Sequence, residues 1–343
     1  FEWVRHWCDH FLAEPTRLSG VDLCIVTARI GPELVMIWPL VRECRLGQCH
    51  IKWIGEPVSQ YGDTLVANRP DADALISAGL DFISAALGED MVILRKVRSD
   101  SRVANVLQRR GNSMTSASDA PFIALPPDTS FASFETRYPA KARKNRRRHR
   151  RRLEEKGVVG FEVIREGSRA RDMVRLAIGY TRSWLQARGL VSRAFSDARL
   201  DSFFEKLAIE EDGGCQLRAF VLTCDGHPVA VNIGFVSGRR MLTHIAAYDP
   251  EYERYSPGSL LFEASIKACL ENGIAVFDFL SPDDGYKRIW ADDSVTVNDY
   301  AIGLTRKGRA YDALYIQRLR PVMKYAMLQM PRLVRPFSRM FNL

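Results

Sequence analysis

The feature that most constrains the fold is a run of three strand-like segments in the second half of the chain. They span Gln216–Cys224, Pro228–Ser237 and Arg240–Tyr248. The links between them, Asp225-Gly226 and Ser237-Gly238, are typical of tight hairpin turns. Segments joined this closely pair with their neighbours, so we expect a three-stranded antiparallel meander.

A helix and a buried strand are predicted to follow the meander. Ser256 is a typical helix N-cap, Pro257 suits the first helical position, and Asn272-Gly273 is a typical helix end. The apolar run Ala275–Leu280 is predicted to be a strand buried on both sides. The elements expected before the meander are a strand at Phe161–Arg165 and helices at Arg169–Arg188 and Asp197–Glu211. The predicted order is therefore β-α-α-β-β-β-α-β.

The first half of the chain alternates predicted strands and helices. Residues 111–130, rich in Ser, Asp and Pro, are expected to separate two domains, because 343 residues with 46% apolar content can bury two cores. We expect domains at residues 1–125 and 126–305 and a tail at residues 306–343. The elements expected in the first half are Glu2–Ala13, Val21–Ile30, Leu34–Arg42, His50–Gly55, Asp71–Leu87, Met91–Val97 and Ser101–Arg110.

The cysteines show no pattern of a metal site or a disulfide framework. Seven are scattered along the chain without a CxxC pair or zinc-ligand spacing. We therefore expect reduced, mostly buried thiols, no bound metal and a cytoplasmic location. No window has the length and apolar content of a membrane-spanning helix.

Positive charge is concentrated in two places. Residues 141–152 hold nine basic residues and no acid, and residues 306–343 hold nine basic residues and one acid. Because the net charge of the whole chain is +8, the remainder is acidic. This distribution indicates that residues 141–152 and residues 306–343 each contact an anionic partner. Nucleic acid is disfavoured, since no aromatic residues that stack on bases are interleaved in the first run.

The tail combines apolar side chains at helical spacing with a cationic rim. Tyr311, Leu314 and Tyr315 follow one helix face with Arg318 beside them, and Pro321 is expected to kink the helix. This pattern is typical of an anchor in the interface of an anionic membrane, so we expect residues 308–343 to bind the inner membrane from the cytoplasm. The alternative is a helix packed on the protein's own surface.

Several segments carry a family resemblance. They are Phe134–Glu162, Ala219–Phe235, Tyr248–Leu261 and Phe277–Trp290, together with the motifs Trp53-Ile54-Gly55 and Tyr61-Gly62-Asp63. These segments resemble the CelD/BcsL branch of the GNAT acyltransferase superfamily, which is similar in turn to the FemAB peptidyltransferases. The resemblance implies an α/β (α+β) fold of two tandem GNAT-like domains, each with a mixed, mostly antiparallel sheet flanked by helices. It also implies an acyl-CoA donor that enters between the last meander strand and the strand after the helix.

The residues expected to bind coenzyme A begin the predicted helix. The family signature Q/R-x-x-G-x-G/A corresponds to Arg254-Tyr255-Ser256-Pro257-Gly258-Ser259, with Pro257 in place of the first Gly. A helix N-terminus offers unpaired N–H groups and a positive dipole end, which suit a pyrophosphate. We therefore expect Arg254, Tyr255, Ser256, Gly258 and Ser259 to bind the donor; the alternative is an ordinary capped helix.

Two catalytic candidates lie on the last meander strand. Alternation along Arg240–Tyr248 is expected to put His244 and Tyr248 on one face, toward the acyl-transfer gap. His244 suits a general base, and Tyr248 can donate a proton to the departing thiolate. The alternative is that His244 is a satisfied core residue. A backbone N–H of this strand can polarise the thioester carbonyl.

The acceptor is expected to bind where the buried strand ends. Asp278 and Asp283 are carboxylates that can bind an ammonium group and help remove its proton. The resemblance implies that Lys287 lies near the acceptor and the transferring acyl group, and that Asp63 and Tyr286 bind substrate. The alternatives are that Asp278 braces the strand and that Lys287 is a solvated loop lysine.

These expectations together indicate an acyl-CoA-dependent N-acyltransferase that uses direct attack on the thioester. An amino sugar of an envelope glycan precursor, or a long-chain amine such as a sphingoid base, would suit the tail. One alternative is a FemAB-like aminoacyl transferase, which the basic run at residues 141–152 favours. The other is a non-catalytic regulatory subunit of polysaccharide synthesis, which the degenerate phosphate-binding signature favours.

Overall fold

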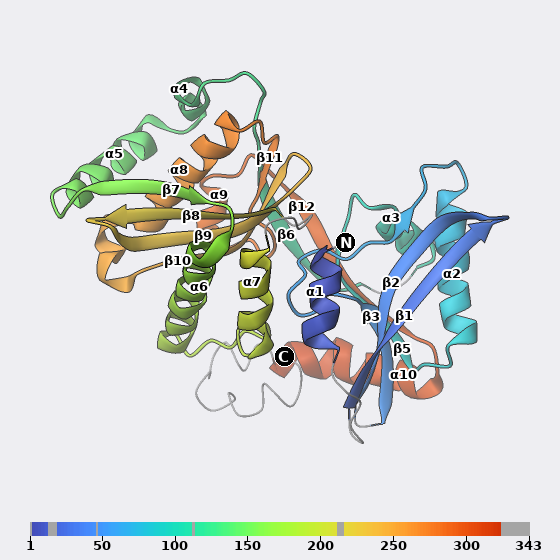
Figure 1. The fold of residues 1–343 in the computed structure, drawn as a ribbon. Helices are drawn as coiled ribbons and strands as arrows, with labels where there is room; N and C mark the ends of the chain where they lie inside the picture. Colours follow the sequence, from blue (N-terminus) through green and yellow to red (C-terminus); the bar gives the residue numbers. More distant parts are fainter. Residues whose placement is uncertain (1, 13–18, 46, 112–113, 211–215, 324–343) are drawn as a thin grey trace. The chain divides into compact units, whose positions relative to one another are not determined.

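The chain folds into helices and strands in a mixed α/β arrangement, which confirms the expected fold class (Figure 1). The computed structural model describes residues 2–12, 19–45, 47–111, 114–210 and 216–323. Two compact units are formed: unit 1 comprises residues 1–6 and 120–294, and unit 2 comprises residues 7–119 and 295–343. The units are interleaved along the sequence, whereas the expected domains (1–125, 126–305 and 306–343) are consecutive, and those boundaries stay a prediction.

Unit 2 is built on a sheet whose first two strands form a long hairpin. Its strands are β1 (Ser19–Ile30), β2 (Glu33–Arg45), β3 (Gln48–Trp53), β4 (Leu65–Val66), β5 (Met91–Arg98) and β12 (Asp293–Gly303). They lie in the order β1-β2-β3-β5-β12, with β4 paired to β2. Helices α2 (Ala72–Ala86) and α3 (Arg102–Arg109) contribute to the core on one face, around Trp38 and Leu94.

The β2–β3 hairpin brings two cysteines together. Cys44 and Cys49 lie opposite each other in the register and form a disulfide. The expectation of reduced thiols is therefore wrong for this pair. The spacing of five residues concealed the pairing, because it matches no disulfide or metal motif, whereas the hairpin register places the two residues side by side.

A helix from the end of the chain packs on unit 2. It consists of α10 (Arg306–Tyr311) and the π-helix η3 (Asp312–Leu319), and Ile316 is buried against Met91, Ile93 and Ala301. For this stretch the structure shows the alternative to a membrane anchor, a helix on the protein's own surface. The rest of the expected anchor, residues 324–343, lies outside the described residues. Among the described helices, none has both the length and the apolar character needed to cross a membrane.

Unit 1 contains the predicted meander at the expected positions. Its strands have the order β6-β11-β10-β9-β8-β7, and the second part of β6 belongs to it. The strands are β6 (Met114–Ala124), β7 (Val159–Ile164), β8 (Gln216–Cys224), β9 (His227–Ser237), β10 (Arg240–Tyr248) and β11 (Val276–Asp278). The helical elements are α4 (Phe131–Phe134), η1 (Glu135–Arg137), α5 (Ala140–Glu154), α6 (Gly167–Ala187), α7 (Arg199–Ile209), η2 (Pro250–Tyr255), α8 (Pro257–Glu271) and α9 (Gly285–Arg288).

Helices cover both faces of the unit 1 sheet. α6 and α7 lie on one face, and α8 and α5 lie on the other (Figure 1). On the α8 side the core is aromatic, with Phe262, Phe277 and Phe279 in mutual edge-to-face contact. The meander therefore presents one face to α8, the helix whose N-terminus was predicted to bind the donor.

Two strands were not anticipated. The segment expected to link the domains contains β6, and β12 follows the last predicted strand. β6 has a composition unfavourable for strands, including Pro121, yet its residues Phe122–Ala124 pair with β11. Pairing with a distant segment therefore overrides the local signal. Residues 114–124 form a strand within the stretch expected to separate two domains, and the division between the two units falls there, at residues 119 and 120.

The docking of α10 can be tested at Gly308. A side chain there would place Cβ 1.8 Å from the backbone oxygen of Asp90, so Gly308→Ala must displace the helix or the loop. We expect a loss of about 1–3 kcal/mol in the free energy of unfolding, measured by urea denaturation. Gly179→Ala is the matched control: its Cβ would meet nothing within 4 Å on α6, so it should stabilise by about 0.5–1 kcal/mol. Equal unfolding midpoints would contradict the close packing of Gly308.

Candidate functional site

The last meander strand and the strand after α8 pair briefly and then diverge. β10 and β11 pair in parallel only from Arg240↔Val276 to Leu242↔Asp278. β11 ends there, while β10 continues paired with β9 to Tyr248. Along residues 243–248, the edge of β10 away from β9 therefore has no strand partner in the described part of the chain. Its backbone N–H and C=O groups are available to a ligand.

Asp278 fixes the point of divergence. Its side chain is 1% exposed; one carboxylate oxygen accepts a hydrogen bond from Arg240 Nη1 at 2.9 Å, and the other accepts one from the backbone N–H of Leu280 at 2.9 Å. Leu280 has a φ of +60°, a conformation that ends a strand. Asp278 therefore braces the end of the strand, and its expected role in substrate binding stays a prediction.

Helix α8 begins without a side-chain cap. Ser256 occupies the N-cap position as expected, but it has left-handed backbone angles (φ 52°, ψ 50°) and its hydroxyl caps no N–H group. The capping hydrogen bond expected of Ser256 is therefore absent. The N–H groups of Ser259 and Leu260 donate to the carbonyl oxygen of Ser256 at 3.0 and 3.3 Å. Within the described structure, Gly258 is therefore the first-turn residue whose N–H is left for another acceptor. Pro257 stands at the first helical position, as predicted.

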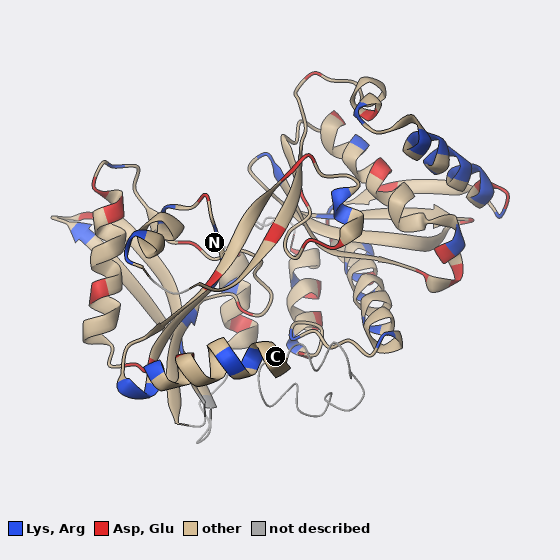
Figure 2. Cartoon of the chain, turned by 180° about the vertical axis from the view of Figure 1, so that it is seen from behind, with Lys and Arg blue, Asp and Glu red and all other residues tan. Residues whose placement is uncertain are grey.

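Two guanidinium groups flank the start of α8. The ring of Tyr255 is 4% exposed, with the guanidinium carbon of Arg254 4.8 Å and that of Arg152 5.8 Å from its centroid. Arg152 belongs to α5, whose basic residues are conspicuous in Figure 2. The basic run therefore adds positive charge where α8 already has its positive dipole end.

The basic run is partly structural. Arg146 is 4% exposed, donates from Nε to Glu263 Oε1 of α8 at 2.7 Å, and lies over the rings of Tyr138 and Trp290. This buried ion pair holds α5 against α8. Arg147, Arg148, Arg151 and Arg152 are exposed, and the guanidinium of Arg152 also lies over the ring of Tyr255.

The two catalytic candidates of β10 lie on opposite faces, so the expected shared face is wrong. The register shifts between Thr243 and Ile245, which leaves His244 as the extra residue of a β-bulge. Tyr248 pairs with Ala230 and packs toward α8, whereas the ring of His244 packs on Phe235 of the other face at 5.1 Å. Simple alternation fails here because one inserted residue reverses the pattern that follows.

His244 is enclosed by aromatic rings. Trp3 and Phe204 lie 5.1 Å and 6.3 Å from it between centroids, and its Nδ1 lies 3.2 Å from the carbonyl oxygen of Leu242. Trp3 comes from α1 (Glu2–Phe11), whose first residues belong to unit 1. This packing is typical of a core histidine, and its role as general base stays a prediction.

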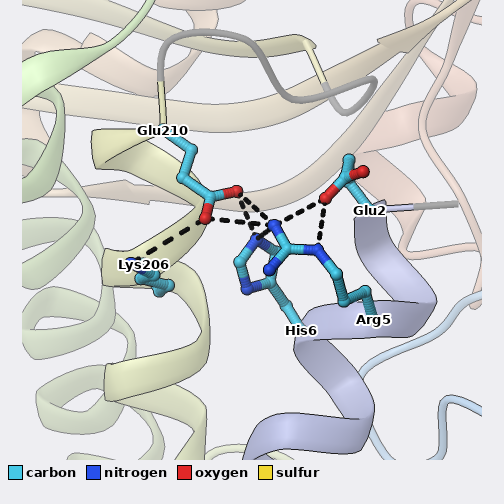
Figure 3. A network of polar contacts seen from close by, with 5 residues as sticks. All are labelled: Glu2, Arg5, His6, Lys206 and Glu210. Atoms are coloured by element: carbon cyan, nitrogen blue, oxygen red, sulfur yellow. Dashed lines mark hydrogen bonds and ion pairs between the residues drawn. The ribbon is translucent and has the colours of Figure 1, made fainter.

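A polar network holds the start of α1 on the end of α7. Glu210 accepts from Arg5 Nη2 at 2.9 Å and lies 2.5 Å from His6 Nε2, with Lys206 and Glu2 at its margins (Figure 3). Desolvation of Glu210 is opposed by these hydrogen bonds, and the net effect lowers its pKa. The network positions Trp3 against His244, a contact between distant residues that no local sequence pattern predicts.

Lys287 is buried, so the alternative of a solvated loop lysine is wrong, and its expected catalytic role stays a prediction. Its side chain is 8% exposed, and Nζ donates to the carbonyl oxygens of Pro282 at 2.6 Å and Leu280 at 3.1 Å, with Asp284 at 3.4 Å. Burial lowers its pKa, although the neighbouring carboxylates oppose the shift. Lys287 therefore ties together the loop that follows β11.

The remaining acceptor candidates differ in setting. Asp283 is nearly buried and pairs with Arg288, yet its Oδ1 has no hydrogen-bond partner in the described structure. Tyr286 stacks on Phe262 of α8 and is 45% exposed.

Asp63 belongs to unit 2, where the adjacent Gly62 packs so closely on Trp53 that a Cβ would lie 2.3 Å from the indole. This contact between Gly62 and Trp53 explains why the motifs Trp53-Ile54-Gly55 and Tyr61-Gly62-Asp63 occur together.

Two polar residues near the divergence were missed from the sequence. Asn232 is fully buried, and neither side-chain polar atom has a partner among the described residues; the same holds for Oγ1 of Thr243. Thr243 is the first β10 residue beyond the pairing with β11, and it pairs with Gly234, which shares a sheet face with Asn232. Such orphaned groups suit a ligand with amide groups. An amide within the apolar run Val229–Phe235 was the available signal.

The comparisons with known proteins agree with this geometry. Residues 140–288 match the family model described as an acetyltransferase (GNAT) domain. The fold is similar to that of FemX (TM-score 0.57, 11% identity, covering 86% of this chain and 90% of that one). It is also similar to the C-terminal domain of a proposed lysylphosphatidylglycerol synthetase from Agrobacterium fabrum (TM-score 0.55, 14% identity, covering 91% and 94%).

A third similar structure is a conserved protein of unknown function from Bacteroides thetaiotaomicron (TM-score 0.53, 10% identity, covering 88% of this chain and 90% of that one). No curated protein sequence matches the chain. At these identities the structural matches establish the fold. The match of residues 140–288 to the acetyltransferase (GNAT) domain covers less than half of the chain, and it supports an acyltransferase.

Proposed function

We propose that the chain is an acyl-CoA-dependent N-acyltransferase whose donor binds where β10 and β11 diverge. The observation that carries this proposal is the unpaired edge of β10 at residues 243–248, followed by the uncapped start of α8. The edge offers backbone groups to the extended arm of coenzyme A, and Thr243 and Asn232 offer unpaired polar atoms. The start of α8, with Arg152 and Arg254 beside it, suits the pyrophosphate.

The reaction uses direct attack by an amine. The neutral amine attacks the thioester carbonyl carbon, the C–S bond breaks, and the thiolate receives a proton while the nitrogen loses one. A backbone N–H of the β10 edge polarises the carbonyl oxygen. Tyr248 is the proton donor in this proposal: burial, and then its hydrogen bond to Glu253 at 3.1 Å, raise its pKa and keep it protonated at neutral pH.

The acceptor is assigned to the loop after β11. The unpartnered carboxylate oxygen of Asp283 can receive an ammonium group, and Tyr286 offers an exposed ring beside it. Lys287 holds this loop in shape, and Asp63 and His244 stay candidates without a further contact to support them. The proposed acceptor is an amine of an envelope glycan or lipid precursor. The fold shared with a domain named as part of a lysylphosphatidylglycerol synthetase supports the lipid alternative.

Two finer assignments belong to this proposal. One is a CelD/BcsL-type role in polysaccharide synthesis, and the other is peripheral binding to an anionic membrane through the end of the chain, now restricted to residues 324–343. The second candidate function is a FemAB-like aminoacyl transfer, which the likeness to FemX favours. A protein that binds no acyl-CoA but accepts an aminoacyl donor would establish that second function instead.

Donor binding is tested by a charge at the start of α8. Ser259→Glu places a carboxylate in the first helical turn, where it favours the helix dipole but repels a pyrophosphate. We expect an intact fold and about tenfold or greater weakening of coenzyme A binding in calorimetry. Ser202→Glu makes the same change in the first turn of α7 and should leave binding unaltered. Equal affinity in both variants, or no binding by the wild type, would remove the donor from this place.

The proton donor is tested by removing one oxygen. Tyr248→Phe keeps the ring and its packing toward α8 but cannot donate a proton. We expect kcat to fall by about 10²-fold or more, as for loss of a general acid, while the affinity for coenzyme A stays within about twofold. Steady-state kinetics with an acyl-CoA and calorimetry together separate the two effects, and an unchanged kcat would exclude Tyr248 from this role.

The loop after β11 is tested through Lys287. Lys287→Met keeps the aliphatic length but leaves the carbonyl oxygens of Leu280 and Pro282 without their donor. We expect the free energy of unfolding to fall by about 1–3 kcal/mol in urea denaturation. Lys267→Met, at an exposed site on α8, should change it by less than about 0.5 kcal/mol. If the two variants are equally stable, Lys287 does not hold the loop.

A further inference from the structure

Unit 2 contains a small pocket between its sheet and the helix α10–η3. The pocket encloses about 40 Å³, room for about three water molecules. Its floor is formed by β3, β5 and β12, on the face opposite the core of α2 and α3. All of its lining residues belong to unit 2, so it is separate from the donor site of unit 1.

Three cationic side chains converge on this pocket from different elements. Lys52 comes from β3, Arg95 from β5, and Arg320 from the turn that follows η3. Lys52 is 5% exposed and pairs with Glu43, and Arg95 lies 3.8 Å from Glu56. No carboxylate lies within ion-pair distance of Arg320 among the residues that the structure describes.

Acids offset part of this charge, since Glu43 pairs with Lys52, Glu56 lies 3.8 Å from Arg95, and Asp299 attracts Arg320. Asp299 is the only acid among the described lining residues, and its oxygens already accept from the backbone N–H of Lys96 at 2.9 Å and from Ser116 Oγ at 3.2 Å. His50 is neutral at neutral pH, because burial and then the charge of Lys52 lower its pKa to about 4. Burial, and then the charge of Arg95, also lower the pKa of Arg320.

The π-helix sets the position of Arg320. A π-turn closes i→i+5 hydrogen bonds, and the backbone N–H of Arg320 donates to the carbonyl oxygen of Tyr315. This wider spacing turns Arg320 toward the side of the helix that carries Tyr311 and Tyr315, both of which line the pocket. Irregular turns of this kind are frequent at functional sites. This one places the guanidinium of Arg320 at a cavity that is also lined by the cationic side chains of Lys52 and Arg95.

We propose that this pocket binds a phosphate group, held by Lys52, Arg95 and Arg320. Guanidinium groups match the oxygen geometry of phosphate, and hydroxyl donors nearby can complete its coordination. The cationic side chains repel one another in the cavity, and Asp299 already accepts hydrogen bonds from Lys96 and Ser116. A phosphate dianion would offset this repulsion. The phosphate can be free or can belong to a phosphorylated molecule, and the recognition chemistry is the same.

The test measures binding of inorganic phosphate, glycerol 3-phosphate and acetate to the full chain in a phosphate-free buffer. We expect saturable phosphate binding in calorimetry and a higher melting temperature with phosphate present. Acetate should bind at least about tenfold more weakly, since it carries one charge. Glycerol 3-phosphate binding more tightly than inorganic phosphate would assign the site to a phosphate monoester, and the reverse would assign it to the free ion.

Substitutions locate the site. Arg320→Gln and Arg95→Gln should each weaken phosphate binding about tenfold or more, whereas Arg109→Gln, the same charge change on α3, should stay within about twofold. Without phosphate, Arg320→Gln should melt no lower than the wild type, because it removes a like charge. Ser259→Glu should keep full phosphate binding, which separates this site from the proposed donor site. No saturable binding by the wild type, equal binding of acetate, or retained binding in both pocket variants would overturn the proposal.

Discussion

The buried carboxylate of Asp278 is the interaction on which the geometry of unit 1 depends. A charged group that is 1% exposed is tolerated only when it is paired and hydrogen-bonded, and Arg240 and the backbone of Leu280 supply both contacts. Because β11 ends at Asp278, where these contacts lie, β10 continues without a strand partner on that side. The unpaired edge of the sheet is thus a consequence of one satisfied buried charge. Proteins usually protect the exposed edge strands of their sheets. A ligand that pairs with the edge of β10 beside the start of α8 would explain why this edge is left open.

The two concentrations of positive charge are used in different ways. In α5, Arg146 is neutralised by Glu263 and fixes the helix on α8, which leaves Arg152 to add charge at the start of α8. In the C-terminal helix, Lys307 pairs with Asp90, and Arg320 reaches a pocket of unit 2. Each basic segment therefore combines an anchoring ion pair with a cation that faces a potential anion. Net charge alone could not separate these roles, because they depend on which acid lies opposite each base.

Local sequence signals predicted the parts of the fold that depend on local physics. The meander strands β8 and β10 have the expected bounds, and α8 begins at Pro257 and ends before Asn272-Gly273, because turn residues and helix ends are short-range features. The errors have a common cause in pairing between strands. β6 is a strand because it lies between β12 and β11, and Cys44 meets Cys49 only in the hairpin register. In the candidate site, the start of α8 was predicted, whereas the burial of Lys287 and the bulge at His244 depend on tertiary packing.

The departure of the donor-binding signature from its family pattern has a physical explanation within the proposed function. A proline at the first helical position has the backbone angle that the helix needs, but it removes one N–H group that a phosphate could use. Here the left-handed conformation of Ser256 keeps its hydroxyl from capping the next amides, and the guanidinium groups of Arg152 and Arg254 stand on both sides of Tyr255. The missing N–H donor is thus compensated by positive charge, from Arg254 of the loop and from Arg152 of the neighbouring helix α5. The buried pair Arg146–Glu263 then matters for donor binding without touching the donor, because it holds that neighbouring helix in place.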